Sequence, residues 1–287
     1  MEKKNFQVKS SSNQLLDVNY YKVEKPKGLV QLLHGMQEHK ERYDDFASFL
    51  AQHGYDVIIH DHLGHGKSIS KTHPLGDMIS LDYVVKDIDI VRKEATHNDN
   101  YILFGHSMGS FLARIYSSLY DVDKLIACGS GQTPNAVAML VKFLLVFNKS
   151  GVPLDNIQKL VLGPMGKKFD DPNDWLSYNK ENQAKYAKDE LCGKPFTKEG
   201  YRTLVDMTTY LNKEDTYKNS SAKEILLISG ADDPVGDFTK GVTFAADKYI
   251  RYGKNVSTKF YENMTHEILN ETDNKKVYED LLQFIEK

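Results

Sequence analysis

Cysteine is scarce in this 287-residue sequence, and long runs of apolar residues are missing. The two cysteines, Cys128 and Cys192, lie far apart and form no C-x-x-C pair, so we expect free thiols. The most apolar stretch, residues 136–147, is interrupted by Lys142 and is far shorter than the roughly 20 residues that span a bilayer. The sequence therefore predicts neither a disulfide framework nor a transmembrane helix.

A strong excess of positive charge is also missing. The formal net charge is -3 and no long basic cluster occurs, so there is no electrostatic case for binding nucleic acid. Residues 1–9 lack the apolar run that a secretory signal needs. We therefore expect a cytoplasmic globular protein, long enough for one large domain or for one domain with an insertion.

Strand-like apolar segments alternate with helix-like segments over most of the chain. The strand signals are at residues 5–10, 15–23, 28–33, 55–59, 101–104, 124–128, 224–229 and 256–261. Alternation of this kind predicts an α/β fold in which helices cover both faces of a mostly parallel central sheet.

The alternation breaks between residues 131 and 221. This stretch has no clear strand, shows helical spacing around 136–147 and 199–212, and is too long for a structureless loop in a compact domain. We expect residues 131–221 to form an inserted helical cap, and residues 1–130 and 222–287 to form the core.

The motif G-H-S-M-G at residues 105–109 follows a strand signal and opens a helix-like segment. In such a turn the serine, Ser107, is held in a strained conformation with its hydroxyl above the sheet, and the glycines avoid a clash. The amide of Met108 then points toward the space in front of the serine. Taken alone, the motif also fits a glycine-rich turn with an incidental serine.

A serine nucleophile needs a histidine base and a carboxylate that orients it. Hydrolases built on such a sheet carry them in the order serine, acid, histidine, and His266 is the one histidine after Ser107. It follows the last strand signal, at the edge of the sheet where ligands bind. The acid should follow the preceding strand, where Asp232 and Asp233 are available. We favour Asp233, the third residue after the strand-ending glycine, and keep Asp232 in reserve.

An acyl-transfer site also needs two backbone amides aimed at one oxygen. Met108 supplies one candidate. The other is Met36, on the loop that follows the strand signal at 28–33. The alternative interpretation is that this loop is only a tight turn.

Three blocks of sequence resemble one known family. Residues 34–43 read HGMQEHKERY, residues 61–68 read DHLGHGKS, and residues 105–109 read GHSMG. They are similar to blocks of the monoacylglycerol lipases and lysophospholipases in the α/β-hydrolase superfamily. The resemblance is strong over residues 28–130 and moderate over 224–285.

The resemblance implies an α/β-hydrolase fold with Ser107 as nucleophile, Asp233 and His266 completing the triad, and the amides of Met36 and Met108 forming the oxyanion hole.

The resemblance further implies that Glu38 and Arg42 brace the oxyanion loop or line the polar end of the substrate pocket, where we also place His106. One departure is that residues 268–270 read ILN, whereas vertebrate members carry a second histidine there. Strict monoglyceride specificity is therefore not implied.

The predicted activity is hydrolysis of carboxylic esters of lipid-like substrates, monoacylglycerol or lysophospholipid, through an acyl-enzyme and with no metal or organic cofactor. The apolar helix at residues 136–147 can pack in the core, cover an acyl chain, or bring the cap into transient contact with a membrane surface.

Four other functions stay open. They are a general short-chain carboxylesterase, a prolyl-aminopeptidase-type peptidase, a zinc hydrolase and a binding protein without chemistry. A peptidase needs an acidic pocket for the substrate amine, for which Asp170, Asp171 and Glu181 are weak candidates. A zinc hydrolase would use residues 60–65, which read HDHLGH and lack an aspartate at the fifth position.

Overall fold

The computed structural model describes residues 1–96 and 99–287. In this part of the chain eight strands form one sheet, in the order β1-β2-β4-β3-β5-β6-β7-β8. The strands are β1 Glu2–Lys9, β2 Leu15–Lys22, β3 Leu29–Leu33, β4 Asp56–His60, β5 Tyr101–His106, β6 Lys124–Cys128, β7 Glu224–Gly230 and β8 Val256–Tyr261. The β1–β2 and β2–β4 pairs are antiparallel and all other pairs are parallel. The predicted α/β fold with a mostly parallel sheet is confirmed.

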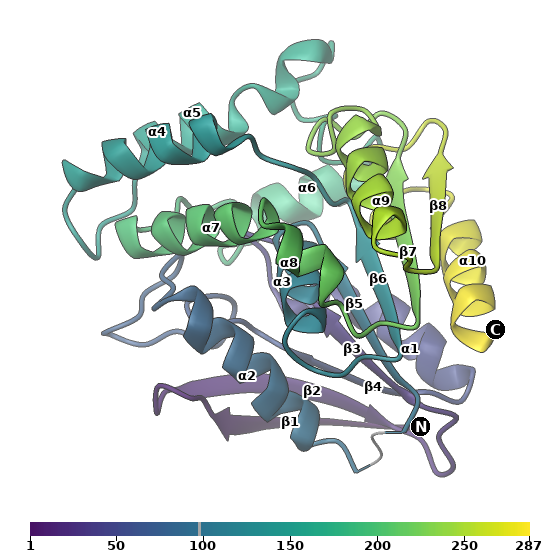
Figure 1. Cartoon of the computed structure of the whole chain (residues 1–287). Helices are drawn as coiled ribbons and strands as arrows, with labels where there is room; N and C mark the ends of the chain where they lie inside the picture. The colour runs from purple at the N-terminus through teal and green to yellow at the C-terminus, as the bar shows by residue number, and fades with distance from the viewer. Residues whose placement is uncertain (97–98) are drawn as a thin grey trace.

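Helices cover both faces of this sheet (Figure 1). The helices that connect or follow the strands are α1 Asp44–Gln52, α2 Leu81–Lys93, α3 Met108–Ser117, α9 Lys240–Arg251 and α10 Asn274–Glu286. Helices α1 and α10 pack on one face, and α2, α3 and α9 pack on the other. Short 3-10 turns lie at Lys40–Tyr43, Met165–Lys168 and Ile268–Asn270.

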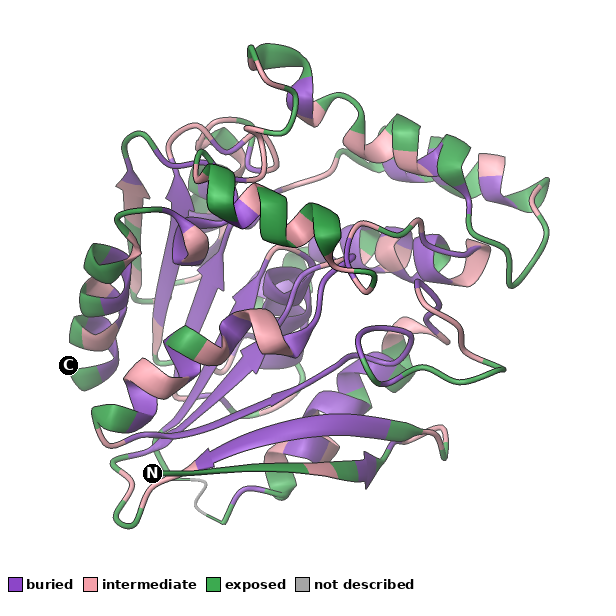
Figure 2. Ribbon diagram, turned by 180° about the vertical axis from the view of Figure 1, so that it is seen from behind, coloured by how far each residue is buried: buried purple, intermediate pink, exposed green. Residues whose placement is uncertain are grey.

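Strands β3, β4, β5 and β6 are buried from both sides, which explains why they read as continuous apolar runs (Figure 2). Successive side chains of β5 alternate between the faces, because Ile102 and Phe104 join the cluster under α1 and α10 while Leu103 joins the cluster under α3. The sheet therefore has two hydrophobic cores, one on each face.

Residues 131–221, the predicted cap, contribute five helices between β6 and β7. They are α4 Asn135–Val146, α5 Asp155–Leu162, α6 Lys180–Lys188, α7 Lys198–Leu211 and α8 Glu214–Lys218. The sequence had indicated only α4 and α7, since α5, α6 and α8 are short or polar. No helix among the described residues is both long and apolar enough to cross a membrane.

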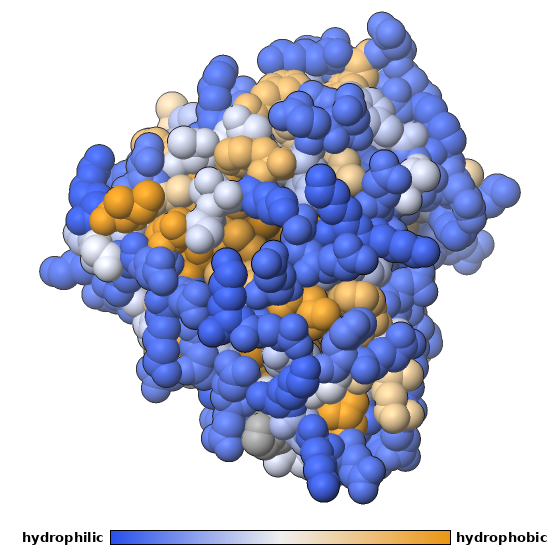
Figure 3. Space-filling view, turned by 90° about the vertical axis from the view of Figure 1, so that its right-hand side faces the viewer, coloured by the Kyte–Doolittle hydropathy of each residue, from blue (hydrophilic) through white to orange (hydrophobic). Residues whose placement is uncertain are grey.

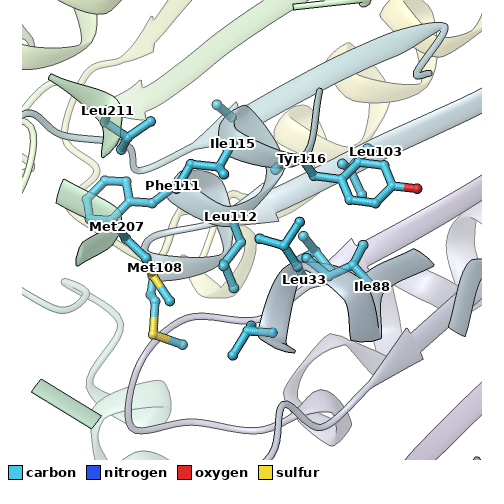
Figure 4. Close-up of a cluster of buried hydrophobic side chains, with 14 of the residues drawn as sticks. Leu33, Ile88, Leu103, Met108, Phe111, Leu112, Ile115, Tyr116, Met207 and Leu211 are labelled. Carbon is cyan, nitrogen blue, oxygen red and sulfur yellow. The ribbon is translucent and has the colours of Figure 1, made fainter. Parts of the chain in front are cut away.

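Helix α7 packs on α3, the helix that follows the G-H-S-M-G turn. Phe111 of α3 lies against Met207 and Leu211 of α7, while Leu112 faces Leu33 of the sheet (Figure 4). The segment inserted after β6 thus shares a hydrophobic core with the helix that begins next to Ser107.

Four histidines, His34, His60, His62 and His65, are buried together at the carboxyl ends of β3 and β4. Burial, with a smaller contribution from the charge of Lys40, lowers the pKa of His60 to about 3. Burial lowers the pKa of His65 to about 4. These imidazoles are therefore neutral in the folded protein at pH 7.

We predict that acid destabilises this protein through the buried histidines. The unfolded chain binds their protons below about pH 6.5 and the folded chain does not, so stability falls as the pH drops through that value. Between pH 7 and pH 5 the loss is on the order of 1 to 2 kcal/mol for each such histidine. The free energy of unfolding, measured in denaturant at both pH values, should fall less in His60→Leu than in wild type. His53→Gln, at an exposed histidine, is the control and should behave as wild type. Equal losses in wild type and His60→Leu would contradict the assignment.

Candidate active site

Strand β5 turns directly into α3 at Ser107, where φ is 53° and ψ is -121°. A Cβ on Gly105 would lie 2.1 Å from the carbonyl oxygen of Gly109, and a Cβ on Gly109 would lie 2.1 Å from that of Leu33. Only glycine fits at either position. The predicted strained turn is therefore present, with a half-buried serine at its apex.

Ser107 lines a small pocket of about 60 Å³ at the carboxyl edge of the sheet. The pocket collects side chains from the loop after β3, the turn at Ser107, the loops after β7 and β8, and the inserted helices. Its lining residues are Gly35, Met36, Gln37, Glu38, His106, Ser107, Leu162, Trp175, Leu176, Tyr186, Val235, His266 and Glu267. Three other residues predicted for the site contact this lining: Met108 follows Ser107, Asp233 contacts His266, and Arg42 contacts Glu38 and Glu267.

His266 and Asp233 are in direct contact. Nδ1 of His266 lies 2.9 Å from Oδ2 of Asp233, and both residues are buried. The same carboxylate oxygen accepts a hydrogen bond from Ser229 Oγ at 3.1 Å. Asp232 instead accepts a hydrogen bond from the hydroxyl of Tyr178 at 3.2 Å. Of the two candidate acids, Asp233 is the one that orients the imidazole.

The contact with Asp233 occupies Nδ1 of His266 and leaves Nε2 for the pocket that Ser107 also lines. Within the described part of the chain, no hydrogen bond joins the hydroxyl of Ser107 to His266. Hydrogen bonds of this type are often long in the absence of substrate and tighten when it binds. The structure thus brings the two side chains to one pocket without a hydrogen bond between them.

Arg42 joins three parts of the chain around this pocket. Its Nη1 lies 2.8 Å from Glu38 Oε2, and its two terminal nitrogens lie 2.5 and 2.6 Å from the carboxylate of Glu267. It also donates to Asn182 on α6 at 3.0 Å, and its guanidinium lies 4.9 Å from the ring centre of Tyr186. The loop after β3, the loop after β8 and α6 are therefore fixed to one another.

Both carboxylates in this network are ionised. Burial opposes ionisation of Glu267, but the charge and hydrogen bonds of Arg42 outweigh burial and lower the pKa of that group. Burial opposes ionisation of Glu38 as well, and the hydrogen bond from His106 and the charge of Arg42 hold its pKa below the ordinary value. Glu38 also accepts from the amide of Gly35 at 2.6 Å, which fixes the residue next to Met36.

His106, the residue before Ser107, has a hydrogen-bond acceptor at each ring nitrogen. Nδ1 lies 3.2 Å from Glu38 Oε1, and Nε2 lies 3.2 Å from the carbonyl oxygen of His266. Burial lowers the pKa of His106, but Glu38 outweighs burial and the net change is upward. Arg42 pairs with both carboxylates, and His106 adds a contact with Glu38.

Glu267 and the cap residues of this network were missed from the sequence. Glu267 had one signal, an acidic side chain directly after His266 on a buried loop. Asn182 and Tyr186 had none, because their partners are at least 85 residues away in the chain.

Residues 60–65 do not form a zinc site in the described chain, because their ligand atoms do not converge with a third ligand. Asp61 instead accepts from the amide of Lys40 at 2.8 Å and from its Nζ at 3.1 Å. The rings of His60 and His62 pack edge to face, with centroids 4.8 Å apart. The histidine-rich motif is therefore a structural element of the core.

A family model described as serine aminopeptidase, S33, matches residues 24–273. The chain belongs to this α/β-hydrolase family. It is 26% identical over 278 residues to a monoglyceride lipase homolog from Monkeypox virus, with 92% of this chain and 91% of the relative covered. It is 27% identical over 274 residues to a monoacylglycerol lipase from Mycolicibacterium smegmatis, with 91% and 88% covered.

A solved structure agrees with these relatives. A highly thermostable carboxyl esterase from Bacillus coagulans, in complex with glycerol, superposes with a TM-score of 0.90 at 28% identity, covering 100% of this chain and 98% of that one. The predicted resemblance to the monoacylglycerol lipase-like members of the α/β-hydrolase family is confirmed. The protein is a carboxylic ester hydrolase.

We predict that Arg42→Met strongly destabilises this hydrolase. The substitution leaves the buried carboxylates of Glu38 and Glu267 without their cation, and breaking a buried ion pair in this way typically costs about 3 to 5 kcal/mol. The free energy of unfolding, measured in denaturant at pH 7, reports the loss. Lys185→Met, which removes an exposed cation paired with Glu181, is the control and should change stability by less than about 0.5 kcal/mol. Similar values for the two variants would show that the network does not hold the loops.

Proposed function

We propose that this hydrolase cleaves the ester bond of monoacylglycerols or lysophospholipids through an acyl-enzyme on Ser107. The observation that carries the proposal is the arrangement at the pocket: a strained serine and a histidine that is bound to a buried aspartate face the same small space. The similarity to proteins named monoglyceride lipase supports the substrate class.

The proposed reaction has two steps. Nε2 of His266 takes the proton of Ser107 as its hydroxyl attacks the ester carbonyl, while Asp233 holds the imidazole in the tautomer with a proton on Nδ1. The alcohol leaves with the proton from His266. Water then attacks the acyl-enzyme in the same way, which releases the fatty acid and restores the serine.

The amides of Met36 and Met108 are the proposed donors to the oxyanion. Met108 is the first residue of α3, where the helix dipole favours negative charge. In the part of the chain that the structure describes, neither amide donates a hydrogen bond to another protein group. Both are therefore available to a substrate oxygen.

Residues 131–221 are proposed to act as the cap that binds the acyl chain. An apolar groove of about 290 Å³ lies between α4, α5 and α7, and its lining includes Leu160 and Val161. The next residue, Leu162, lines the pocket of Ser107. An acyl chain can extend from the serine into this groove, and each methylene that it buries adds about 0.8 kcal/mol to binding.

Helix α4 is the proposed point of contact with a lipid surface. It lies on the upper left in Figure 1, and Met139, Phe143 and Phe147 along it are 70%, 61% and 74% exposed. The face that includes β8, α9 and α10 is hydrophilic over much of its area and also carries apolar patches (Figure 3). A cluster of large exposed apolar side chains on one helix marks an interaction site, and a lipid interface also holds the substrate.

An aminopeptidase activity is not favoured by the charges at the pocket. The carboxylates that line it, Glu38 and Glu267, are already paired with Arg42. Asp171 pairs with Lys180 away from the pocket, and Glu181 is exposed. No unpaired carboxylate among the described lining residues can bind a substrate amine. Short-chain ester hydrolysis is the second candidate, because the closed pocket at Ser107 is small.

We predict that Ser107→Ala and Asp233→Asn lower kcat by about 10³-fold or more, whereas Asp232→Asn changes it less than about tenfold. The side chain of Asp233 orients His266, whereas the side chain of Asp232 accepts a hydrogen bond from Tyr178 instead. The assay is a panel of p-nitrophenyl esters from acetate to palmitate, with monoacylglycerol and lysophosphatidylcholine.

Circular dichroism shows whether each variant is folded, and Ser118→Ala at the end of α3 is the matched serine control. An active Ser107→Ala would overturn the mechanism. A preference for acetate over long-chain esters in wild type would favour the carboxylesterase alternative.

We predict that replacing Met139 and Phe143 by serine together lowers hydrolysis of monoacylglycerol in vesicles several-fold, while hydrolysis of p-nitrophenyl acetate is unchanged. The double variant loses apolar surface on α4 without touching the pocket of Ser107. Binding to vesicles of phosphatidylcholine with monoacylglycerol, measured by sedimentation, should fall in parallel. Replacing Phe244 and Ile250, exposed on α9, by serine is the control. Equal effects of both pairs would argue against α4 as the contact surface.

A further inference from the structure

The turn after α6 meets the loop after β3 at a cluster of three side chains, His39, Asp189 and Cys192. Nε2 of His39 lies 2.7 Å from Oδ2 of Asp189, and the thiol of Cys192 completes a group whose ligand atoms all lie within 4.8 Å of one another. Across residues 1–96 and 99–287, this is the one such convergence of three histidine, cysteine or acidic side chains. It lies apart from Ser107, and the proposed reaction does not use it.

The backbone holds the cluster in shape. The amide of Cys192 donates to the carbonyl of Asp189 at 3.1 Å, and the amide of Leu191 donates to Oδ1 of the Asp189 side chain at 2.9 Å. The next amide, of Gly193, donates to the carbonyl of Gln37 at 2.9 Å. The turn is therefore closed on itself and fixed to the loop that carries His39.

One imidazole nitrogen, one carboxylate oxygen and one thiolate are typical ligands of zinc. Bonds of about 2.0 to 2.3 Å in a tetrahedral arrangement place ligand atoms roughly 3.3 to 3.8 Å apart. The contact between His39 and Asp189 must therefore widen by roughly 0.6 Å, and Cys192 must approach by up to about 1 Å. The Asp189 side chain is 32% exposed and has room for such a shift.

A polar pocket of about 420 Å³ gives a cation access to the cluster. Its lining includes His39 and Asp189, and it carries more acidic than basic side chains. The acidic residues are Glu41, Asp44, Asp45, Glu181 and Asp189, and the basic residues are Arg42 and Lys185. Arg42 is already balanced by Glu38 and Glu267, Glu41 and Asp44 pair with Lys3, and Glu181 pairs with Lys185. The carboxylates of Asp45 and Asp189 therefore carry the unbalanced negative charge of the pocket.

We propose that His39, Asp189 and Cys192 bind a zinc-like divalent cation, with a fourth position open to this pocket. The cation displaces the proton of the Cys192 thiol, which passes to solvent, and it takes the place of the hydrogen between Nε2 of His39 and Asp189, so that the neutral imidazole keeps one proton, on Nδ1. It joins the cap to the loop that carries Met36. Its binding is independent of ester hydrolysis and can be measured without a substrate.

Cobalt(II) is the probe, because a tetrahedral cobalt–thiolate site absorbs in the near ultraviolet and in the visible. Titrating the purified full chain with cobalt should give both absorptions at one equivalent, and zinc should bleach them. Zinc should also raise the Tm of the protein by several degrees. Cys192→Ser should lose the near-ultraviolet band and His39→Gln, which can keep a hydrogen bond to Asp189, should weaken cobalt binding at least tenfold.

Two variants serve as controls for the assignment. Cys128→Ala removes the other cysteine, and His73→Gln removes an imidazole that pairs with Asp77 at the same distance of 2.7 Å. Both should bind cobalt as wild type does. Absence of a thiolate band in wild type, or its loss in Cys128→Ala rather than in Cys192→Ser, would overturn the proposal whether or not the other variants fold.

Discussion

The contact of Arg42 with Glu38 and Glu267 is the constraint on which the site depends. Glu38 and Glu267 are buried and the side chain of Arg42 is only 10% exposed, and buried charges are tolerated only when they are paired with good geometry. Glu38 holds the amide of Gly35, and Glu267 follows His266. One guanidinium therefore fixes both the loop of the proposed oxyanion donor and the loop of the proposed base. His106 contacts Glu38 and the carbonyl oxygen of His266 and so joins the same loops directly before the serine.

The sheet supplies the other half of the geometry. Strands β3, β5, β7 and β8 are parallel, so the loops that follow them meet at one edge. Residues far apart in the chain reach one pocket for this reason. The sheet brings the loops to one edge, and the contacts of Arg42 with Glu38 and Glu267 then fix how two of these loops lie against each other. The sheet alone is not sufficient, because without the contacts of Arg42 the loop after β8 is free to place His266 away from Ser107.

Local rules made the core and the turn predictable from sequence. Gly105 and Gly109 signal a turn that no larger residue can make, and the order of strands places Asp233 and His266 on adjacent loops. The cap was predicted only as helical, because its short helix α6 is polar and has little periodic signal. Glu267 and Asn182 escaped prediction for a different reason. Their roles come from a contact with Arg42, which no local pattern encodes.

The inserted segment, residues 131–221, is attached to the rest of the molecule by polar contacts at α6 and by apolar packing at α4. Helix α6 is attached to Arg42 through Asn182 and the ring of Tyr186, whereas α4 leaves large apolar side chains exposed. Pockets for ligands of moderate size are typically about 300 to 1,000 Å³, and the space at Ser107 is about 60 Å³. The long acyl chain of the proposed substrate must therefore displace part of the lining. The segment around Leu162 lies between the pocket and the groove lined by α4, α5 and α7, and it lacks the contacts with Arg42 that α6 makes. Substrate entry should therefore move α4 and α5 while α6 stays in place.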